Sequence, residues 1–543
     1  MNAFEQNSPP PSPVLRAEAD AVIVGAGFAG LYMLHRLRNL GFSACVLEAG
    51  GGVGGTWYWN RYPGARCDGE SMFYSYQFSD ELQQEWEWSE RYAAQPEILR
   101  YANHVADRFD LRRDIRFNTR VTAAIYNETA ARWTIESEDG AHVSARFVVM
   151  ATGCLSAANL PTFEGLETFA GATYHTGHWP HGGADFSGLR VGVIGTGSSA
   201  IQAIPLIAEQ ARHLTVFQRT PNYAIPAWNG PLDAESVRRV KENYAQYRAR
   251  QRETFTGNMW DARDQSALAV TPEERQREYE ARWREGGLGF MASYNDLLYD
   301  DEANATAADF VRGKIREVVN DPAVADILSP KFIIGCKRLC VDTDYYQTYN
   351  RANVTLVDVG ATPIARIAPQ GVVVGSRTYE LDAIVFATGF DAMTGSLLRI
   401  DIRRARGETL REKWRDGPVS YLGLSVAGFP NLFTITGPGS PSVLTNMIPS
   451  IEQHVEWIAD CIGHMRDSGL RRIEATRDAE TAWVAHVADT ADKSLRPSCN
   501  SWYVGANVPG KPRVFMPYMG GLPAYRRICD EVAANGYEGF ALA

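Results

Sequence analysis

The sequence predicts an α/β fold in which two Rossmann-like domains share one chain, the second inserted into the first and carrying a helical subdomain. Two glycine-rich loops, in VIVGAGFAG and VGVIGTGSSA, each follow a short apolar segment and precede a helical pattern. Two further apolar segments, in FVVMATG and AIVFATG, end in the same Ala-Thr-Gly. The length of 543 residues suits two or three domains, each with its own core.

The composition excludes several classes of protein. Charged residues are 22% and hydrophobic residues 45% of the chain, and the net charge of -10 gives no attraction to nucleic acid or anionic lipid. No apolar run approaches the roughly 20 residues that span a bilayer, so no membrane partner is expected. Residues 1–20 are polar and proline-rich without an apolar signal core, which predicts a flexible tail on a cytoplasmic protein.

The first strand-turn-helix unit occupies AVIVGAGFAG and the helical pattern LYMLHRLRNLG. Gly25 permits the tight turn, Gly27 lets a pyrophosphate approach the backbone, and Gly30 lets the helix pack on the strand. The next strand, in FSACVLEAG, ends in Glu48, where a carboxylate can accept both ribose hydroxyls of a dinucleotide. Phe28 and Ala29 complete the predicted phosphate-binding turn. An unrelated glycine-rich turn is the alternative, and the complete unit disfavours it.

The second unit repeats this pattern in LRVGVIGTGSSA, with Gly195, Gly197 and Ala200 in the glycine positions. No acid ends its second strand, LTVFQRT. Instead Arg219, followed by Thr220, stands nineteen residues past Ala200. A guanidinium there can pair with a 2′-phosphate, which predicts NADPH in preference to NADH. A solvated arginine at a strand end is the alternative.

The two units predict a discontinuous domain arrangement. Residues 21–150 and 390–543 are expected to build the first domain, and residues 151–389 the second. The two Ala-Thr-Gly segments would mark the crossings between them. Within the second domain, residues 232–330 contain charged helical runs in which acids and bases alternate, so we expect a surface helical subdomain without a catalytic role.

The eight cysteines show no CxxC pair and no spacing typical of a metal site, so no metal is expected. Reduced, structural cysteines are predicted. Cys336 and Cys340, in GCKRLC, are the only close pair, and both are interpreted as packing residues.

Two segments carry a resemblance to a known family. GVGGTWYWNRYPGARCD follows Glu48, and FAGATYHTGHWP separates the two glycine loops. The second contains a complete F-x-G-x-x-x-H-T-x-x-W-P pattern, at Phe169, Gly171, His175, Thr176, Trp179 and Pro180. With the double dinucleotide fold, the chain resembles the single-chain Baeyer–Villiger monooxygenases, which use FAD, NADPH and molecular oxygen. The resemblance implies that the first domain binds FAD and the second NADPH.

The resemblance also implies a reaction. NADPH reduces FAD, the reduced flavin adds oxygen at C4a, and the resulting peroxide attacks a ketone to form a tetrahedral adduct that rearranges to an ester or lactone. Arg338 matches the family's active-site arginine, Asp68 the acid that pairs with it, and Trp502 a tryptophan on a mobile loop over the bound NADP. Lys337 would reach the NADP phosphate, and Arg66 would touch the nicotinamide cofactor.

Further cofactor contacts are expected on both domains. Around the flavin they are Gly55, Thr56, Trp57, Trp59, Tyr74, Val121 and Met447. Around NADP they are Thr196, Ser198, Ser199 and Gln202, beside Lys337, Arg338 and Trp502. His175 is either a hydrogen-bonding strut or a mobile element that senses NADPH. We favour the strut because no acid or nucleophile lies near it in the sequence.

Other functions remain open at this stage. An N- or S-oxygenating flavin monooxygenase shares both nucleotide folds. A pyridine-nucleotide disulfide reductase needs a redox dithiol, which no CxxC supplies. A redox-sensing binder would keep the glycine loops without needing Arg338, Asp68 and Trp502 together. The substrate is expected to be a small-molecule ketone, whether cyclic, aryl-alkyl or steroid, and the protein a monomer or weak oligomer.

Overall fold

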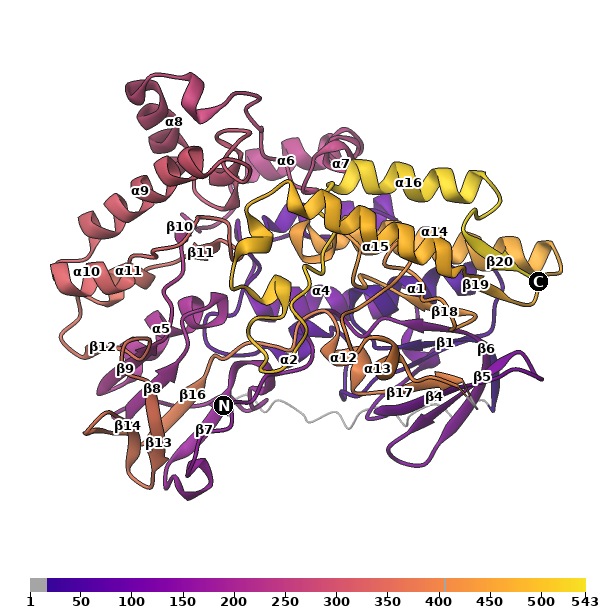
Figure 1. Ribbon diagram of the computed structural model, residues 1–543, viewed down its shortest axis with the longest axis horizontal. Coiled ribbons are helices and arrows are strands. Elements are labelled where there is room, and N and C mark those ends of the chain that lie inside the picture. Colours follow the sequence, from indigo (N-terminus) through magenta and orange to yellow (C-terminus); the bar gives the residue numbers. More distant parts are fainter. Residues whose placement is uncertain (1–16, 405–406) are drawn as a thin grey trace.

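The computed structural model describes residues 17–404 and 407–543, which form two sheet-centred regions and a helical region (Figure 1). One sheet lies at the lower right of Figure 1 beneath α1 and α14, the other at the lower left, and α8 and α9 project at the upper left. The α/β fold expected from the sequence is confirmed.

The first sheet has eight strands, in the order β17-β4-β5-β6-β1-β2-β3, with β18 beside β6. It draws them from both ends of the chain. They are β1 (Glu18–Val24), β2 (Ala44–Leu47), β3 (Ile115–Arg116), β4 (Val121–Asn127), β5 (Arg132–Ser137), β6 (His142–Met150), β17 (Asp401–Arg404) and β18 (Leu432–Thr434). β1 runs parallel to both β2 and β6, and its last four side chains are buried on both faces, as expected for a central parallel strand.

Two helices cover one face of this sheet. α1 (Phe28–Asn39) starts directly after the first glycine loop, and α14 (Met447–Asp467) packs against it (Figure 1). Both bury most of their length in the largest apolar core. The opposite face of the sheet packs on a smaller core that includes Trp133, Leu397 and Trp414.

The second sheet is parallel throughout, in the order β12-β9-β8-β16-β7. Its strands are β7 (Ala172–His175), β8 (Arg190–Ile194), β9 (His213–Gln218), β12 (Val354–Asp358) and β16 (Ala383–Phe386). α5 (Ser198–Gln210) joins β8 to β9. Because the strands are parallel, the loops that follow them meet at one edge of the sheet. A small antiparallel sheet, made of β13 (Ile364–Ala368), β14 (Gly371–Val374) and β15 (Arg377–Glu380), precedes β16 in the chain.

The stretch 232–330 contains five α-helices separated by irregular segments. They are α6 (Ala234–Glu242), α7 (Tyr244–Glu253), α8 (Pro272–Glu285), α9 (Asp301–Val318) and α10 (Pro322–Leu328). The remaining helices are α2 (Thr56–Trp59), α3 (Asp80–Glu85), α4 (Gln95–Arg108), α11 (Tyr345–Thr348), α12 (Gly395–Leu398), α13 (Leu410–Lys413), α15 (Arg477–Asp492) and α16 (Leu522–Ala534). Two strand pairs complete the fold, β10 (Ala224–Pro226) with β11 (Cys340–Asp342) and β19 (Ile473–Ala475) with β20 (Phe540–Leu542).

Two expectations from the sequence need correction. The predicted tail, residues 1–20, extends too far, because β1 already begins at Glu18; residues 1–16 lie outside the described part of the chain. Cys336 is not a reduced packing residue, because a disulfide joins it to Cys499, 163 residues away. Sequence spacing gives no sign of this pair, since only the tertiary fold brings the two segments together. Cys340 is buried and packs in the core of the second sheet.

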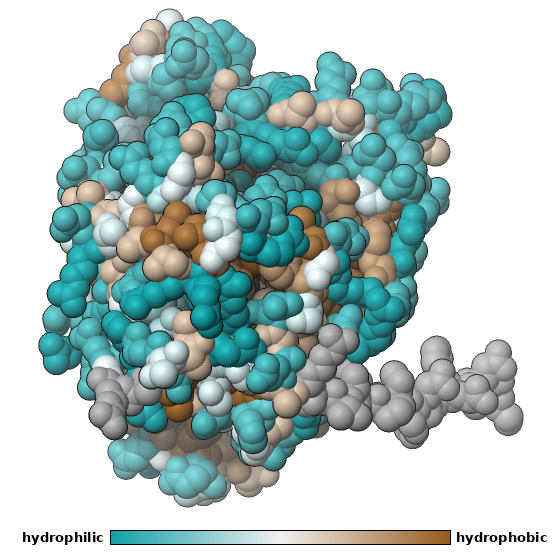
Figure 2. Space-filling view, turned by 90° about the vertical axis from the view of Figure 1, so that its right-hand side faces the viewer, coloured by the Kyte–Doolittle hydropathy of each residue, from teal (hydrophilic) through white to brown (hydrophobic). Residues whose placement is uncertain are grey.

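The surface seen in Figure 2 is mainly hydrophilic, with hydrophobic side chains gathered in small separate groups. Within residues 17–404 and 407–543, no helix is both long enough and apolar enough to cross a bilayer.

Candidate active site

The first glycine loop leaves space that only glycine can leave. A Cβ on Gly30 would lie 1.8 Å from the carbonyl oxygen of Gly25, so any larger residue would push α1 off β1. Gly27 is the N-cap of α1, and Gly55 faces it so closely that a Cβ on Gly55 would lie 2.9 Å from the Gly27 Cα. This cradle of bare backbone at the N-terminus of a twelve-residue helix fits a pyrophosphate.

Glu48 stands where the sequence predicts, immediately after β2. Its carboxylate is buried and accepts hydrogen bonds of 2.6 Å from the backbone N–H groups of Ala26 and Gly50. Burial raises the pKa of Glu48, and these two hydrogen bonds oppose the rise. Val121, the first residue of β4, packs in one apolar core with residues at the ends of β1 and β2. The residues expected around the adenosine half of FAD therefore gather at one end of the first sheet.

Two of the predicted flavin contacts, Trp57 and Tyr74, meet, whereas the ring of Trp59 meets that of His178. The indole nitrogen of Trp57 donates to the hydroxyl of Tyr74 over 3.2 Å, and the two rings meet edge to face. Trp57 belongs to the single-turn helix α2, which begins at Thr56 and ends at Trp59. Gln95 donates to the carbonyl of Trp57 and holds that turn in place.

The second glycine loop meets Arg219 at the carboxyl edge of the second sheet. Gly195 follows β8 and Arg219 follows β9, and the hydroxyl of Thr196 donates to the carbonyl of Thr220 over 2.8 Å. Around Gly197, the N-cap of α5, a Cβ would meet nothing within 4 Å. Open space therefore lies between the N-terminus of α5 and the end of β9, as an NADP phosphate requires.

Two cations face this space without an acidic partner. Burial and the nearby Arg219 both lower the pKa of Lys337. Within the described ranges, neither Arg219 nor Lys337 makes an ion pair, and Lys337 lies over the ring of Phe332. An exposed Arg219 and a half-buried Lys337 that repel each other fit a dianionic phosphate between them, so the donors present suit the 2′-phosphate of NADPH.

Arg338 and Asp68 meet, although 270 residues separate them in the chain. The Arg338 Nε lies 3.3 Å from the Asp68 Oδ2, and the side chains are 34% and 10% exposed. Arg338 also donates 2.9 Å from Nη1 to the carbonyl of Val443, in the loop before α14. Burial lowers the pKa of Arg338, but Asp68 together with Tyr503 and Cys67 offsets this, so the net pKa is raised and the guanidinium stays charged. Burial raises the pKa of Asp68, and Arg338 opposes that rise.

Asp68 is held from the second domain as well. Gln202, in α5, donates from Nε2 to the Asp68 Oδ1 over 3.2 Å and to the carbonyl of Arg66 over 3.1 Å, and its Oε1 accepts from the hydroxyl of Tyr62. Ser198, the first residue of α5, donates to the Asp68 Oδ2 over 3.4 Å. The helix that begins at the second glycine loop therefore positions the acid beside Arg338.

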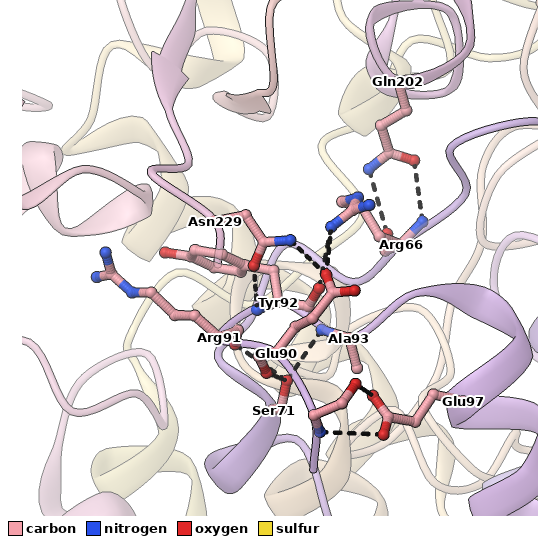
Figure 3. A network of polar contacts seen from close by, with 10 residues as sticks. Arg66, Ser71, Glu90, Arg91, Tyr92, Ala93, Glu97, Gln202 and Asn229 are labelled. Carbon is pink, nitrogen blue, oxygen red and sulfur yellow. Dashed lines mark hydrogen bonds and ion pairs between the residues drawn. The ribbon is translucent and has the colours of Figure 1, made fainter. Parts of the chain in front are cut away.

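Arg66 has a protein partner of its own. Its Nη1 forms an ion pair with Glu90 over 3.1 Å and donates to the carbonyl of Tyr92 over 3.2 Å. Asn229 donates to the same Glu90 carboxylate and accepts the backbone N–H of Tyr92 (Figure 3). Figure 3 shows this network between the 66–71 and 89–97 segments, with Asn229 and Gln202 approaching from the second domain. The Arg66 guanidinium is thus held by the 90–92 segment of its own part of the chain, and Asn229 contacts the same segment.

The loop that carries Trp502 packs over this junction. The rings of Trp502 and Tyr503 lie with their centres 4.2 Å apart and their planes tilted by 42°. Tyr503 is buried beside Arg338 and helps to raise the pKa of that guanidinium. Val443 and the partly buried Met447 belong to the same apolar cluster as these two rings. The loop thereby covers the side of the Arg338 guanidinium that faces Val443.

The same loop is fastened to both crossings between the domains. Lys511 forms a 2.6 Å ion pair with Asp391, and Asn507 donates to the carbonyl of Phe390 over 2.7 Å. Asn159, on the other crossing, donates to the carbonyl of Asn507 over 3.1 Å. The position of the loop is therefore coupled to the relative position of the two crossing segments.

His175 has the contacts of a strut. It ends β7, accepts the backbone N–H of Gly177 on Nδ1 over 2.9 Å, and lies 3.2 Å from the hydroxyl of Thr388 on Nε2. Thr388 in turn donates to the carbonyl of Asn159. Burial and the nearby His178 lower the pKa of His175 to about 4, so the ring is neutral near pH 7. These contacts join the end of β7 to both crossings.

Sequence reasoning missed three contacts around Arg338. Each lies near a predicted residue. Tyr503 follows Trp502, the Val443 carbonyl belongs to a residue in the apolar cluster of Met447, and the Cys336–Cys499 disulfide begins two residues before Arg338. Only the adjacency of Tyr503 to Trp502 offered a signal. A carbonyl carries no side-chain pattern, and a disulfide of long separation carries no spacing rule.

Comparison with known proteins agrees with this geometry. Residues 22–257, which include both glycine loops, match the family described as pyridine nucleotide-disulphide oxidoreductase. A Baeyer–Villiger monooxygenase from Pseudooceanicola batsensis is 45% identical over 96% of both chains. An acetone monooxygenase (methyl acetate-forming) from Gordonia sp. is 43% identical over 96% of this chain and 99% of that protein. The solved structure of an oxidized steroid monooxygenase bound to NADP is 55% identical, with a TM-score of 0.93 over 97% of this chain and 99% of that one. The resemblance seen in the fingerprint and the glycine loops is confirmed, and the chain belongs to the Baeyer–Villiger monooxygenases.

Proposed function

We propose that this chain binds FAD on the first domain and NADPH on the second, and that it inserts one oxygen atom of O₂ into a carbon–carbon bond beside a ketone. The partly buried Arg338–Asp68 pair carries the proposal, because it lies between the segments expected to bind the two dinucleotides. A cation held there by groups from both domains can serve NADPH binding and the oxygenation in turn.

Reduced FAD, when bound, supplies the activated oxygen that no side chain can provide. The cradle at Gly27 and Gly55 and the carboxylate of Glu48 hold its pyrophosphate and ribose. Trp57 and Tyr74 line the expected flavin end. Arg219 and Lys337 hold the 2′-phosphate of NADPH, and the N-terminus of α5 its pyrophosphate.

The Arg338 guanidinium stabilises negative charge that develops on the oxygen of the ketone carbonyl. A guanidinium keeps its charge at any working pH, and its contacts with Asp68 and the Val443 carbonyl leave further N–H groups to donate. Asp68 holds the guanidinium in place without taking part in proton transfer. Because Trp502 and Tyr503 cover the junction, water is kept away from the charged oxygen.

The substrate is proposed to be a ketone with an apolar body. Val443, Met447, Trp502 and Tyr503 provide an apolar cluster beside Arg338. The 55% identity to a steroid monooxygenase supports testing steroid ketones first, followed by cyclic, aryl-alkyl and small aliphatic ketones. A monomer or weak oligomer remains our expectation.

The decisive experiment traces the oxygen atom of O₂ that enters the ester. Purified protein loaded with FAD is given NADPH and ¹⁸O₂ with each ketone, and NADPH oxidation, oxygen uptake and ester are measured together. The proposal expects one ester per NADPH and one ¹⁸O atom in each ester, with Arg338→Met forming none. Oxidation of NADPH at the same rate with and without every ketone, with no labelled ester, would refute it. Oxygenation of amines or sulfides alone would favour the N- or S-oxygenating alternative.

A further inference from the structure

The Cys336–Cys499 disulfide joins the two segments that carry Arg338 and Trp502. Cys336 lies two residues before Arg338, and Cys499 three residues before Trp502. Their Cα atoms are 5.7 Å apart, inside the range that a disulfide spans without moving the backbone. Since 163 residues separate the two cysteines, this bond is a long-range connection across the candidate active site.

The contacts next to the disulfide hold the same two segments together. Arg496 donates from Nε to the carbonyl of Gly335 over 3.1 Å, and its guanidinium lies over the ring of Tyr503. The Tyr503 carbonyl accepts the backbone N–H of Met516, which closes the loop on itself. The disulfide is therefore the covalent part of a contact that aligns Tyr503 with Arg338.

The segment beyond Cys499 has little regular structure to fix its position. After the short 3-10 helix Trp502–Val504, no helix or strand occurs until α16 begins at Leu522. Segments outside helices and strands open locally at a lower free-energy cost than the strands of a sheet, even where turn hydrogen bonds such as that from the Gly505 N–H to the Trp502 carbonyl hold them. A covalent tie at one end therefore has a large effect on how often the loop leaves Arg338.

One cysteine of the disulfide borders a cavity. A cavity of about 500 Å³ lies beside Cys499, between α15 and the 513–516 segment. Its lining includes Trp483, Val487, Val504 and Phe515. Both cysteines of the disulfide are otherwise buried, Cys336 at 4% and Cys499 at 8% exposure, so this cavity is the route that we assign to a dithiol.

We propose that Cys336 and Cys499 form a reversible thiol–disulfide site that locks the Trp502 loop over Arg338 when oxidised and releases it when reduced. Hydrogen peroxide oxidises the pair: two thiols lose two protons and two electrons, the S–S bond forms, and the peroxide becomes two waters. A dithiol reverses the change by thiol–disulfide exchange and is itself oxidised to a disulfide. The enzymatic consequence rests on the proposed function, since it assumes that Arg338 and the loop enclose the reacting ketone.

A peptide map tests the bond without reference to activity. The FAD-loaded full chain is treated with hydrogen peroxide or with dithiothreitol, free thiols are blocked with iodoacetamide in denaturant, and peptides are examined without reductant. The proposal expects a linked Cys336–Cys499 peptide after peroxide and two alkylated peptides after dithiothreitol. Full alkylation of both cysteines after peroxide treatment would overturn it.

Loop release is tested by limited proteolysis of the same samples. Because a cross-link closing a loop this long shifts the closing equilibrium strongly, reduction is expected to speed cleavage between residues 500 and 521 by at least about tenfold. The Cys336→Ser, Cys499→Ser and doubly substituted proteins should all match the reduced wild type, since each lacks the same bond. Cys45→Ser, on β2, is the matched control and should retain the response to dithiothreitol. Equal cleavage of oxidised and reduced wild type would refute the lock.

The effect on catalysis is read from peroxide release. With ketone present, reduction is expected to raise the hydrogen peroxide formed per NADPH by at least about twofold, because an open loop admits water to the charged site. The double variant should show this higher value in both redox states. Redox-independent coupling in the wild type, with ester still formed, would overturn the lock and leave the monooxygenase assignment standing. Absence of ester in every state would instead refute the proposed function, while the peptide map still decides the bond.

Discussion

Replacement of Arg219 or Lys337 by alanine should raise the KM for NADPH and leave the KM for NADH nearly unchanged. The two cofactors differ only in the 2′-phosphate, and these two cations face that position without an acidic partner among the described residues. NADH is therefore an internal control for folding, for FAD content and for every other contact of the nucleotide.

The expected size follows from exposure. A hydrogen bond to a charged group contributes about 1.5–3 kcal/mol, which is about 10- to 150-fold in KM. Lys337 is half-buried, so Lys337→Ala is expected within this range. Arg219 is exposed and its contact is screened by solvent, so Arg219→Ala is expected to cost about 1 kcal/mol, or about fivefold. Both losses should shrink at high salt.

The assay is steady-state NADPH and NADH oxidation with a saturating ketone. Arg212→Ala is the matched control, because Arg212 precedes β9 at the opposite edge of the sheet from Arg219. A pH effect on NADPH binding is also expected. Burial and Arg219 lower the pKa of Lys337, so its charge is lost earlier as pH rises, and the KM for NADPH should rise in alkaline solution. Lys337→Arg should flatten that rise. Equal losses for NADPH and NADH would refute the phosphate assignment.

Four further predictions address the junction, the fold and stability. Arg338→Lys should keep NADPH oxidation but lower the ester yield at least about tenfold, because a lysine cannot contact Asp68 and the ketone carbonyl oxygen together. Gas chromatography of the product measures the yield, and an unchanged yield would contradict the role of the guanidinium. Gln202→Leu removes a hydrogen-bond donor that opposes the rise which burial causes in the pKa of Asp68. The acidic limb of the pH profile of kcat/KM for ester formation should therefore move to higher pH. An unmoved limb would count against Gln202 as a group that positions Asp68. Gly30→Ala should abolish FAD retention, because its Cβ would meet the Gly25 carbonyl. The control Gly313→Ala lies in open space on α9, so it should retain FAD and raise the free energy of unfolding by up to about 1 kcal/mol. A Gly30→Ala protein that still binds FAD fully would show that the loop adapts. Burial lowers the pKa of His454 to about 3, so the folded protein keeps the ring neutral while the unfolded chain takes up a proton below about pH 6.5. The contribution of His454 to the free energy of unfolding should be full above that pH and fall as pH decreases from 6.5 towards 3. His454→Asn retains an acceptor for the Thr436 N–H, and it should reduce the slope of the unfolding free energy against pH by up to about 1.4 kcal/mol per pH unit in urea titrations. An unchanged slope would exclude His454 as the cause.

The sequence by itself determined the local units of this protein. A strand, a glycine turn and a helix are adjacent in the chain, so their pattern can be read from residues 21–48 and 189–220 alone, and the structure places both as predicted. Glu48 and Arg219 were found in the same way, because each ends a strand at a fixed distance from a glycine loop. The roles of Arg338, Asp68 and Trp502 came from resemblance, since their neighbouring residues carry no local rule.

Only the tertiary structure decided which of these units meet. Packing of the second domain on the first brings Asp68 to Arg338 across 270 residues and places Gln202 beside both. The same packing joins Cys336 to Cys499, against the expectation of a reduced packing residue, while Arg66 is paired with Glu90 by the fold of residues 66–92. Contacts within a strand-turn-helix unit follow from backbone periodicity, which neighbouring residues set. Contacts between units depend on how two buried surfaces fit together, and no periodicity in the chain encodes that fit.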